Sequence, residues 1–208
     1  AVTANARRRM GQEVVILDPF GESEDALNPM EAIDPASPDA PDQCLRLARM
    51  ICAKYSLKDD PFWDETAQTI IAGSLLFFAM HIPRKDRHMG LLHRMWGVAD
   101  HLEEMLAIME SCEIHGGAMA AAARLYTGAP DRTAGSILTS LRQNISFLAS
   151  PRAQTSISGG WGTLKKIRER SVPMTIYLRV PPHMLSSHAP LMRAWLGTLI
   201  QTVAERSA

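Results

Sequence analysis

The carboxylate with the clearest chemical placement in this sequence is Asp18. The four apolar residues Val14 to Leu17 indicate a buried strand, and Asp18 and Pro19 follow it at once, with a glycine two positions later. Ligands of open α/β sheets bind beyond the carboxyl ends of the strands, where nucleotides and metals are usually handled. Asp18 and Pro19 are therefore candidates for the vicinity of a nucleotide site. The alternative is a plain turn in which Asp18 caps neighbouring backbone.

The sequence lacks the residue patterns of other common catalytic and metal-binding sites. The seven histidines are scattered, none forms an H-E-x-x-H pair, and no Cys/His group has zinc-like spacing, so we expect no metal site. The sequence contains no G-x-S-x-G nucleophile motif and no G-x-x-x-x-G-K-[ST] phosphate loop. S-G-G-W-G at 158–162 lacks the lysine and the preceding strand, which predicts a flexible connection. We assign no catalytic residue.

The motif DPFWDETA at 60–67 carries acids, but their positions favour a structural role. Asp60 before a proline is typical of a helix N-cap, and acids in the first turn suit the helix dipole. Phe62 and Trp63 then either anchor the core or form a ridge for a partner. We favour the core, because Trp63 shares a face with Ile70.

Composition describes an ordinary globular chain. Of 208 residues, 46% are hydrophobic, and Lys+Arg and Asp+Glu are both 22, which argues against a dedicated non-specific nucleic-acid binder. The basic groups Arg7 to Arg9 and 165–170 could contact phosphates, although a solvated helix face explains them more simply. The longest apolar stretch, 70–80, is about half of the ~20 residues that a membrane-spanning helix needs.

The elements that must position these residues follow a simple order. Strands are predicted at 13–17 and 172–180, an extended proline-rich linker at 18–42, and a last helix at about 190–205. Between the strands, periodicity and start signals predict helices at about 41–56, 61–82, 91–98, 102–112, 117–126 and 131–150. The predicted fold is α/β with an inserted all-α domain. Residues 1–40 and 151–208 form a partial sheet domain, and 41–150 form the inserted one, with the two strands parallel in one sheet.

Six stretches, taken in order, resemble a known family. They are TANARRRMGQEVVILDPFG, ALNPMEAID, DPFWDETAQTIIAG, the SILTSL helix ending in LASPRAQ, VPMTIYLRVPP and PLMRAWLGTLI. In this order they resemble the TraG/TraD coupling proteins of type IV secretion and conjugative DNA transfer systems. Each stretch is short, but their combined order is specific, and the resemblance extends over nearly the whole chain.

This resemblance implies the sheet of a RecA-like P-loop NTPase carrying a helical bundle, in a homo-hexameric ATPase and DNA translocase at the cytoplasmic face of the bacterial inner membrane. Its partners would be relaxase or effector proteins, DNA and secretion-channel components. ATP and Mg²⁺ would be cofactors of the complete protein and would not bind this chain alone, because the phosphate loop would precede residue 1 and the acidic second motif would follow residue 208. We therefore expect an excised piece of a longer protein, inactive by itself. The alternative is a stand-alone helical docking module without catalytic activity.

If the resemblance holds, the helical domain should bind cargo through exposed polar faces. The stretch 89–126 is the candidate, because methionine-rich surfaces adapt to varied partners and acids suit a basic protein partner. Its acids are Glu103, Glu104, Glu110 and Glu113. Its methionines are Met89, Met95, Met105, Met109 and Met119. The alternative is that these methionines fill an irregular core.

Overall fold

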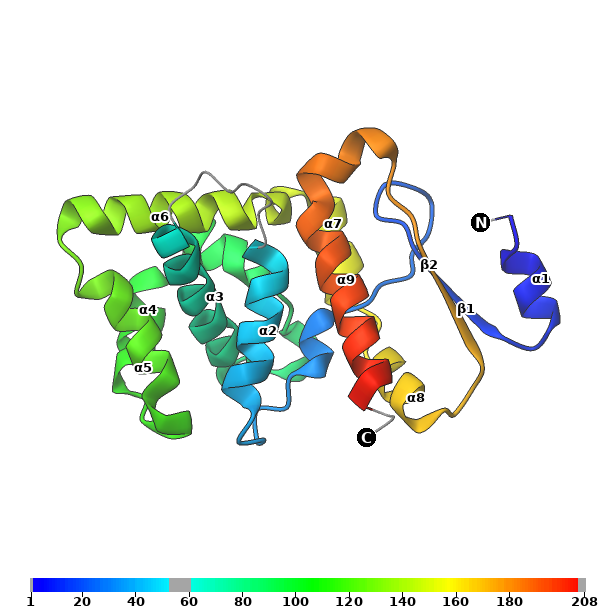
Figure 1. The fold of residues 1–208 in the computed structure, drawn as a ribbon, viewed down its shortest axis with the longest axis horizontal. Coiled ribbons are helices and arrows are strands. Elements are labelled where there is room, and N and C mark those ends of the chain that lie inside the picture. Colours follow the sequence, from blue (N-terminus) through cyan, green and yellow to red (C-terminus); the bar gives the residue numbers. More distant parts are fainter. Residues whose placement is uncertain (1, 53–60, 206–208) are drawn as a thin grey trace.

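The computed structural model describes residues 2–52 and 61–205, which are mostly helical with one small sheet (Figure 1). The strands are β1 (Glu13–Leu17) and β2 (Met174–Leu178). The α-helices are α1 (Ala4–Arg9), α2 (Ala40–Cys52), α3 (Pro61–His81), α4 (Leu102–Ser111), α5 (Ile114–Thr127), α6 (Asp131–Ile145), α7 (Pro151–Ser158), α8 (Thr163–Glu169) and α9 (Leu185–Glu205). Short 3₁₀-helices are η1 (Pro29–Ala32), η2 (Arg84–Asp86), η4 (Ser146–Ala149) and η5 (Pro182–Met184), and η3 (His93–Gly97) is a π-helix.

The two strands pair in parallel, as the sequence predicts. The register places Val15 opposite Ile176. Beyond β2, the Arg179 N–H donates to the Leu17 carbonyl at 2.9 Å, so the ladder continues past the strand end. Val15 and Leu17 are buried, whereas every residue of β2 is half-buried. Within 2–52 and 61–205 the sheet has these two strands, and a complete RecA-like sheet is not observed.

Segment 18–42 contains no α-helix until Ala40, which agrees with its five prolines. Before α2 it contains the 3₁₀-helix η1, where Asn28 accepts from Met30 N–H at 3.1 Å and donates to the Arg87 carbonyl at 2.6 Å. The Trp195 indole N–H donates to the Leu27 carbonyl at 2.9 Å. The linker is therefore fixed onto the helices rather than being a loose connection.

The helical block is built around α3, which lies between α2 and the pair α4 and α5 (Figure 1). Ile70, Ile71 and Phe78 on α3 are fully buried. A Cβ added at Gly73 would meet the Ala122 Cβ at 2.3 Å, so the glycine allows α3 and α5 to approach closely. The described part of 60–150 contains no strand, and its buried apolar side chains form one cluster with those of the sheet and α9.

Several predicted boundaries differ in detail. Asp131 is the first residue of α6 and not its cap, because the cap position is occupied by Pro130. Helix α5 begins at Ile114 and kinks over 115–117, where the backbone has positive φ. Helix α9 begins five residues earlier than predicted and kinks at His188, since Pro190 lacks the N–H that would continue the helix.

The aromatic pair of the DPFW motif divides between core and surface. Trp63 is half-buried and packs against the core, whereas Phe62 is 54% exposed and contacts Trp63 edge-on with ring centroids 5.1 Å apart. The core interpretation is therefore wrong for Phe62, because it points away from the buried face of α3. The predicted cap, Asp60, lies outside the described residues.

Candidate functional site

The carboxyl ends of the strands bring Asp18 and Arg179 together. Leu17 and Leu178 are partners in the parallel register, so the residues that follow them leave the sheet side by side. Arg179 Nη1 lies 3.2 Å from Asp18 Oδ2. Asp18 is only 4% exposed, while the Arg179 side chain is 67% exposed. Sequence reasoning placed Asp18 here but missed Arg179, although its position directly after the second strand was the available signal.

The turn after β1 encloses the Asp18 carboxylate. Pro19 is buried, and the Gly21 N–H donates to the Asp18 carbonyl at 3.3 Å. A Cβ at position 21 would lie 2.2 Å from Asp18 Oδ2, so a larger residue would displace the carboxylate. Arg152 from α7 donates to the Phe20 carbonyl at 3.3 Å, which fixes the far side of the turn.

Helix α9 contacts the same turn through His188. The His188 ring meets Phe20 edge-on, with centroids 4.7 Å apart, and its Nδ1 lies 2.9 Å from Ser187 Oγ. Its Nε2 is shielded from solvent and has no hydrogen-bond partner in the described structure. Burial lowers the pKa of His188, outweighing a backbone hydrogen bond at Met184 that raises it. His188 is therefore a neutral, packed side chain at the kink of α9.

These residues do not by themselves form a magnesium–nucleotide site. Asp18 already pairs with an arginine, and the described ranges contain no group of three His, Cys, Asp or Glu side chains that could hold a metal. Backbone amides that could hold an anion do occur in the glycine-rich loop, but Glu31 occupies them. Its carboxylate accepts from Gly162 N–H at 2.8 Å and Leu164 N–H at 3.3 Å. The expectation of a flexible loop is therefore wrong, because Glu31 anchors it.

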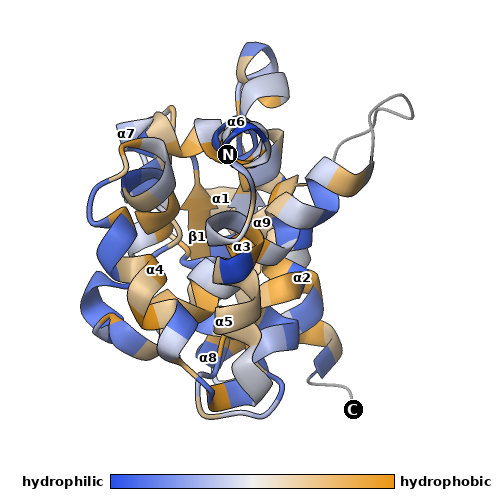
Figure 2. Ribbon diagram, turned by 90° about the vertical axis from the view of Figure 1, so that its left-hand side faces the viewer, coloured by the Kyte–Doolittle hydropathy of each residue, from blue (hydrophilic) through white to orange (hydrophobic). Residues whose placement is uncertain are grey.

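The predicted acidic residues lie at the end of the molecule far from the sheet, where α4 and α5 face the viewer in Figure 2. Glu103, Glu104 and Glu113 are exposed, and Glu104 lies 3.4 Å from His101 Nδ1. Glu110 is half-buried and accepts a hydrogen bond from Thr127, which ties α4 to α5. Three of the four acids are thus accessible from solvent, whereas Glu110 has a structural contact.

The expected methionine-rich surface is not present, and the core alternative is confirmed. Four of the five methionines are at most 1% exposed and the fifth is half-buried: Met89, Met105, Met109, Met119 and, half-buried, Met95. The flexible thioether side chain fills the irregular gaps between these short helices. Exposed apolar side chains at this end belong instead to Val98, Ile108, Ile114 and Leu125.

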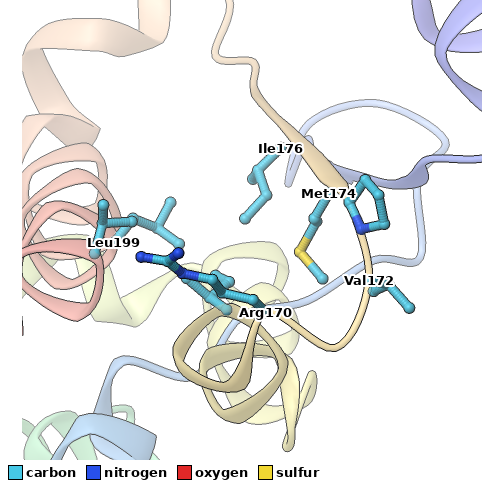
Figure 3. A pocket seen from close by; sticks show the side chains of 8 residues that line it. Arg170, Val172, Met174, Ile176 and Leu199 are labelled. Carbon is cyan, nitrogen blue, oxygen red and sulfur yellow. The ribbon is translucent and has the colours of Figure 1, made fainter. Parts of the chain in front are cut away.

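An open apolar cavity of about 520 Å³ lies between β2, the loop before it, and α9 (Figure 3). Met174 and Ile176 point from β2 into this cavity, and the Arg170 side chain extends along it toward Leu199 of α9. Leu196 and Ile200, on α9, are at least half exposed. The face of the sheet toward α9 is therefore only partly covered.

No helix within 2–52 and 61–205 has both the length and the apolar character needed to cross a bilayer. A search of curated proteins gave no match. The family model for the type IV secretory system conjugative DNA transfer proteins matches residues 1–208. With the parallel strand pair and the helical block between its strands, the chain belongs to this family of conjugative DNA transfer proteins.

Proposed function

We propose that the chain is part of a coupling ATPase that recruits relaxase–DNA or effector cargo and drives its transfer through a type IV secretion channel. The observation that supports this most directly is the Asp18–Arg179 pair at the carboxyl edge of a parallel strand pair, in a chain of the conjugative DNA transfer family. Ligands of α/β sheets bind at this edge. In this proposal Asp18, Pro19 and Arg179 form one wall of the nucleotide site.

The remaining parts of that site come from elsewhere in the assembled protein. ATP and Mg²⁺ need backbone amides and a lysine around the phosphates and a carboxylate for the metal, and the described residues do not supply this set. The chain alone should therefore hydrolyse no ATP. We further propose a homo-hexamer at the cytoplasmic face of the bacterial inner membrane, in contact with DNA and secretion-channel components.

Cargo binds, in this proposal, to the α4–α5 end. Glu103, Glu104 and Glu113 give this surface exposed negative charge, and Ile114 adds a 55% exposed apolar side chain beside them. A basic protein segment with apolar residues matches this combination, because opposite charge guides association and apolar contact holds the complex.

The strand-end proposal is tested with Arg179→Ala and Asp18→Asn in the complete coupling protein. If these residues border the nucleotide, both changes lower ATP turnover and conjugative transfer by at least roughly tenfold at unchanged protein level. Lys166→Ala is the matched control, because it removes an ion pair to Glu13 at the opposite end of β1, where Nζ–Oε1 is 2.8 Å. Unchanged turnover in both test variants would refute the assignment and favour a docking module without catalytic activity.

The cargo surface is tested separately by reversing Glu103 and Glu104 to lysine. Cargo capture should weaken, and the loss should shrink as salt rises, while ATP turnover is preserved. Reversal of Glu22 and Glu24, two exposed acids in the loop after β1, changes the net charge equally at a distant place. Equal capture by the wild type and the α4 variant would remove this surface from the proposal.

A further inference from the structure

A second cavity, of about 540 Å³, lies where the linker before α2, the turn after α3 and the start of α8 meet. Its walls carry four cationic side chains: Arg84, Arg87, Lys165 and Arg168. They come from two elements far apart in the sequence, the turn 84–87 and α8. No sequence motif indicated this grouping, because the fold alone brings the two segments together.

Three of these cations lack a nearby carboxylate. Lys165 pairs with Glu169 at 3.7 Å, whereas in the described structure no acid lies within 4 Å of Arg84, Arg87 or Arg168. Burial lowers the pKa of Arg87, and the like charge of Arg84 lowers it further. The Arg87 guanidinium donates twice to the Ile82 carbonyl, at 3.3 and 3.2 Å, which fixes its position. Three cations of this cavity are thus not engaged in an ion pair in the described structure, and Arg87 is held in a fixed position.

The acids that line the same cavity already have partners. Glu31 accepts from the backbone at the start of α8, and Asp34 Oδ1 accepts from Ala36 N–H at 3.0 Å. Glu205 lies 3.9 Å from Arg46 and accepts from Gln201 at 2.8 Å. Among these acids Glu205 has a cationic partner, whereas Glu31 and Asp34 are held by neutral backbone amides. Four cations against three acids still give the lining a net positive charge, which favours an anion as the ligand.

An aromatic platform stands beside these cations. Arg84 Cζ lies 4.8 Å from the ring centroid of Trp161, so the guanidinium stacks on the indole. Trp161 lines the cavity, and its Nε1 is shielded from solvent without an acceptor in the described structure. Stacked arginine and tryptophan planes next to fixed cations are the combination that binds bases and phosphates of single strands.

We propose that this cavity binds a segment of single-stranded nucleic acid, with a phosphodiester at Arg87 and Arg168 and a base stacked on the Arg84–Trp161 pair. The inference deepens the proposed function and rests on it, since it names where the transferred strand contacts this chain. An acidic peptide would satisfy the cations but would leave the aromatic plane unused. A zero net charge over the whole chain is compatible with this, because the binding charge is local.

The test measures binding of fluorescently labelled dT20 to the complete protein without nucleotide, by anisotropy over a series of salt concentrations. Combined Arg84→Ala and Arg168→Ala should weaken binding at least about tenfold at low salt and reduce the salt slope by about one. Trp161→Leu should weaken it roughly five- to hundredfold with little change in slope, because it removes stacking and not charge. The matched control, Arg7→Ala with Arg8→Ala, removes the same charge from exposed α1 and should leave binding unchanged.

Three results would overturn the proposal: dT20 affinity unchanged in both test variants, equal loss in the α1 control, or a polyglutamate peptide bound as tightly as dT20 through the same residues. Circular dichroism melting of each variant distinguishes lost contacts from lost folding. Binding is measured without ATP, so this inference can fail while Arg179→Ala still abolishes turnover and transfer. Conversely, dT20 binding can depend on Arg84, Arg168 and Trp161 while Arg179→Ala leaves ATP turnover unchanged.

Discussion

The helical block and the strand pair solve burial in different ways. In the block, Ile71 and Leu75 of α3 are completely buried by neighbouring helices of the same chain. In the strand pair, β2 has no buried residue, and its apolar side chains border the open cavity beside α9. Parallel sheets are normally covered on both faces. The helical block is therefore stabilised by contacts within itself, whereas the strand pair leaves apolar surface exposed that another segment or protein can cover.

Polar contacts follow the same division. Within the block, Ser74 Oγ accepts from the Trp96 indole N–H at 2.9 Å, and both residues are fully buried. At the strands, charged groups are paired at the two ends of β1, and each pair includes a well-exposed cation. Removing groups from the block should therefore cost stability, and removing groups from the strand ends should chiefly affect binding.

The largest effect is expected from Trp96→Ala. Trp96 is completely buried within the block and contacts Tyr126 edge-on, with ring centroids 5.2 Å apart. Its truncation leaves a cavity and removes the donor to Ser74 Oγ, which keeps only its own hydrogen bond to the Ile70 carbonyl at 2.9 Å. It should lower the free energy of unfolding by about 3–5 kcal/mol. Urea denaturation monitored by circular dichroism measures this loss. A change below about 1 kcal/mol would show that the block can collapse around the gap.

Glu31→Ala should come second, because it removes the acceptor for the amides at the start of α8. Those amides are bonded at 2.8 and 3.3 Å, and a lost buried partner costs about 1–3 kcal/mol. Glu31→Gln is the control, since it keeps one oxygen acceptor and should lose less. Equal stability of both variants and the wild type would mean that water replaces the carboxylate without cost.

Ile176→Ala tests the open face of the sheet directly. Ile176 is half-buried and borders the cavity in Figure 3, so truncation should cost only roughly 1 kcal/mol in this chain. The same change should cost more in any longer protein or complex in which the cavity is filled. A loss matching that of Trp96→Ala in the chain alone would contradict the contrast between the two regions.

The smallest stability effect belongs to the exposed ion pair of Lys166 and Glu13. Lys166→Ala should lower the free energy of unfolding by no more than about 1 kcal/mol. An exposed ion pair is only slightly lower in free energy than the two ions separately hydrated by water. Raising the salt concentration should reduce the difference from the wild type further. A difference that persists in high salt would point to packing of the Lys166 stem instead of its charge.

Features that depend on the residues of a single helix or strand could be predicted from the sequence more readily than contacts between distant segments. The strand at 13–17 and the stripe Ile137, Leu141 and Ile145 follow from periodicity within single elements, and both are observed. The Asp18–Arg179 pair needs the parallel register as well, so only its first member was found. Glu31 meets Gly162 across 131 positions, and no local pattern reports such a contact.

Predictions that depended on how many residues of one type a segment contains were wrong where the fold determines which way those residues face. The methionines of 89–126 were interpreted as a surface because of their number, but the helix faces that carry them turn inward. The basic group 165–170 was interpreted as a solvated helix face, and only the fold places Lys165 and Arg168 beside the turn 84–87 around one cavity. The sequence predicted helices, strands and the parallel pairing of the two strands, but it did not predict which side chains of distant elements contact one another.

The last prediction concerns the pH dependence of stability and the contact that His188 of α9 makes with Phe20 in the turn after β1. Burial lowers the pKa of His188 in the folded chain below its ordinary value near 6.5. Between the pKa of His188 in the folded chain and about 6.5, the unfolded chain binds a proton that the folded chain does not. The contribution of the neutral imidazole to folding stability is therefore fully present above this pH window and is lost as pH falls through it. His188→Phe, which keeps a ring against Phe20, should therefore reduce the loss of stability between about pH 7.5 and 5.5. Some pH dependence should remain, because burial also lowers the pKa of His88.

Denaturant titrations at several pH values measure the free energy of unfolding of each variant, with His183→Gln as the exposed control. If the His188→Phe variant kept the full wild-type pH dependence, the imidazole would not be the group that couples the turn after β1 to α9.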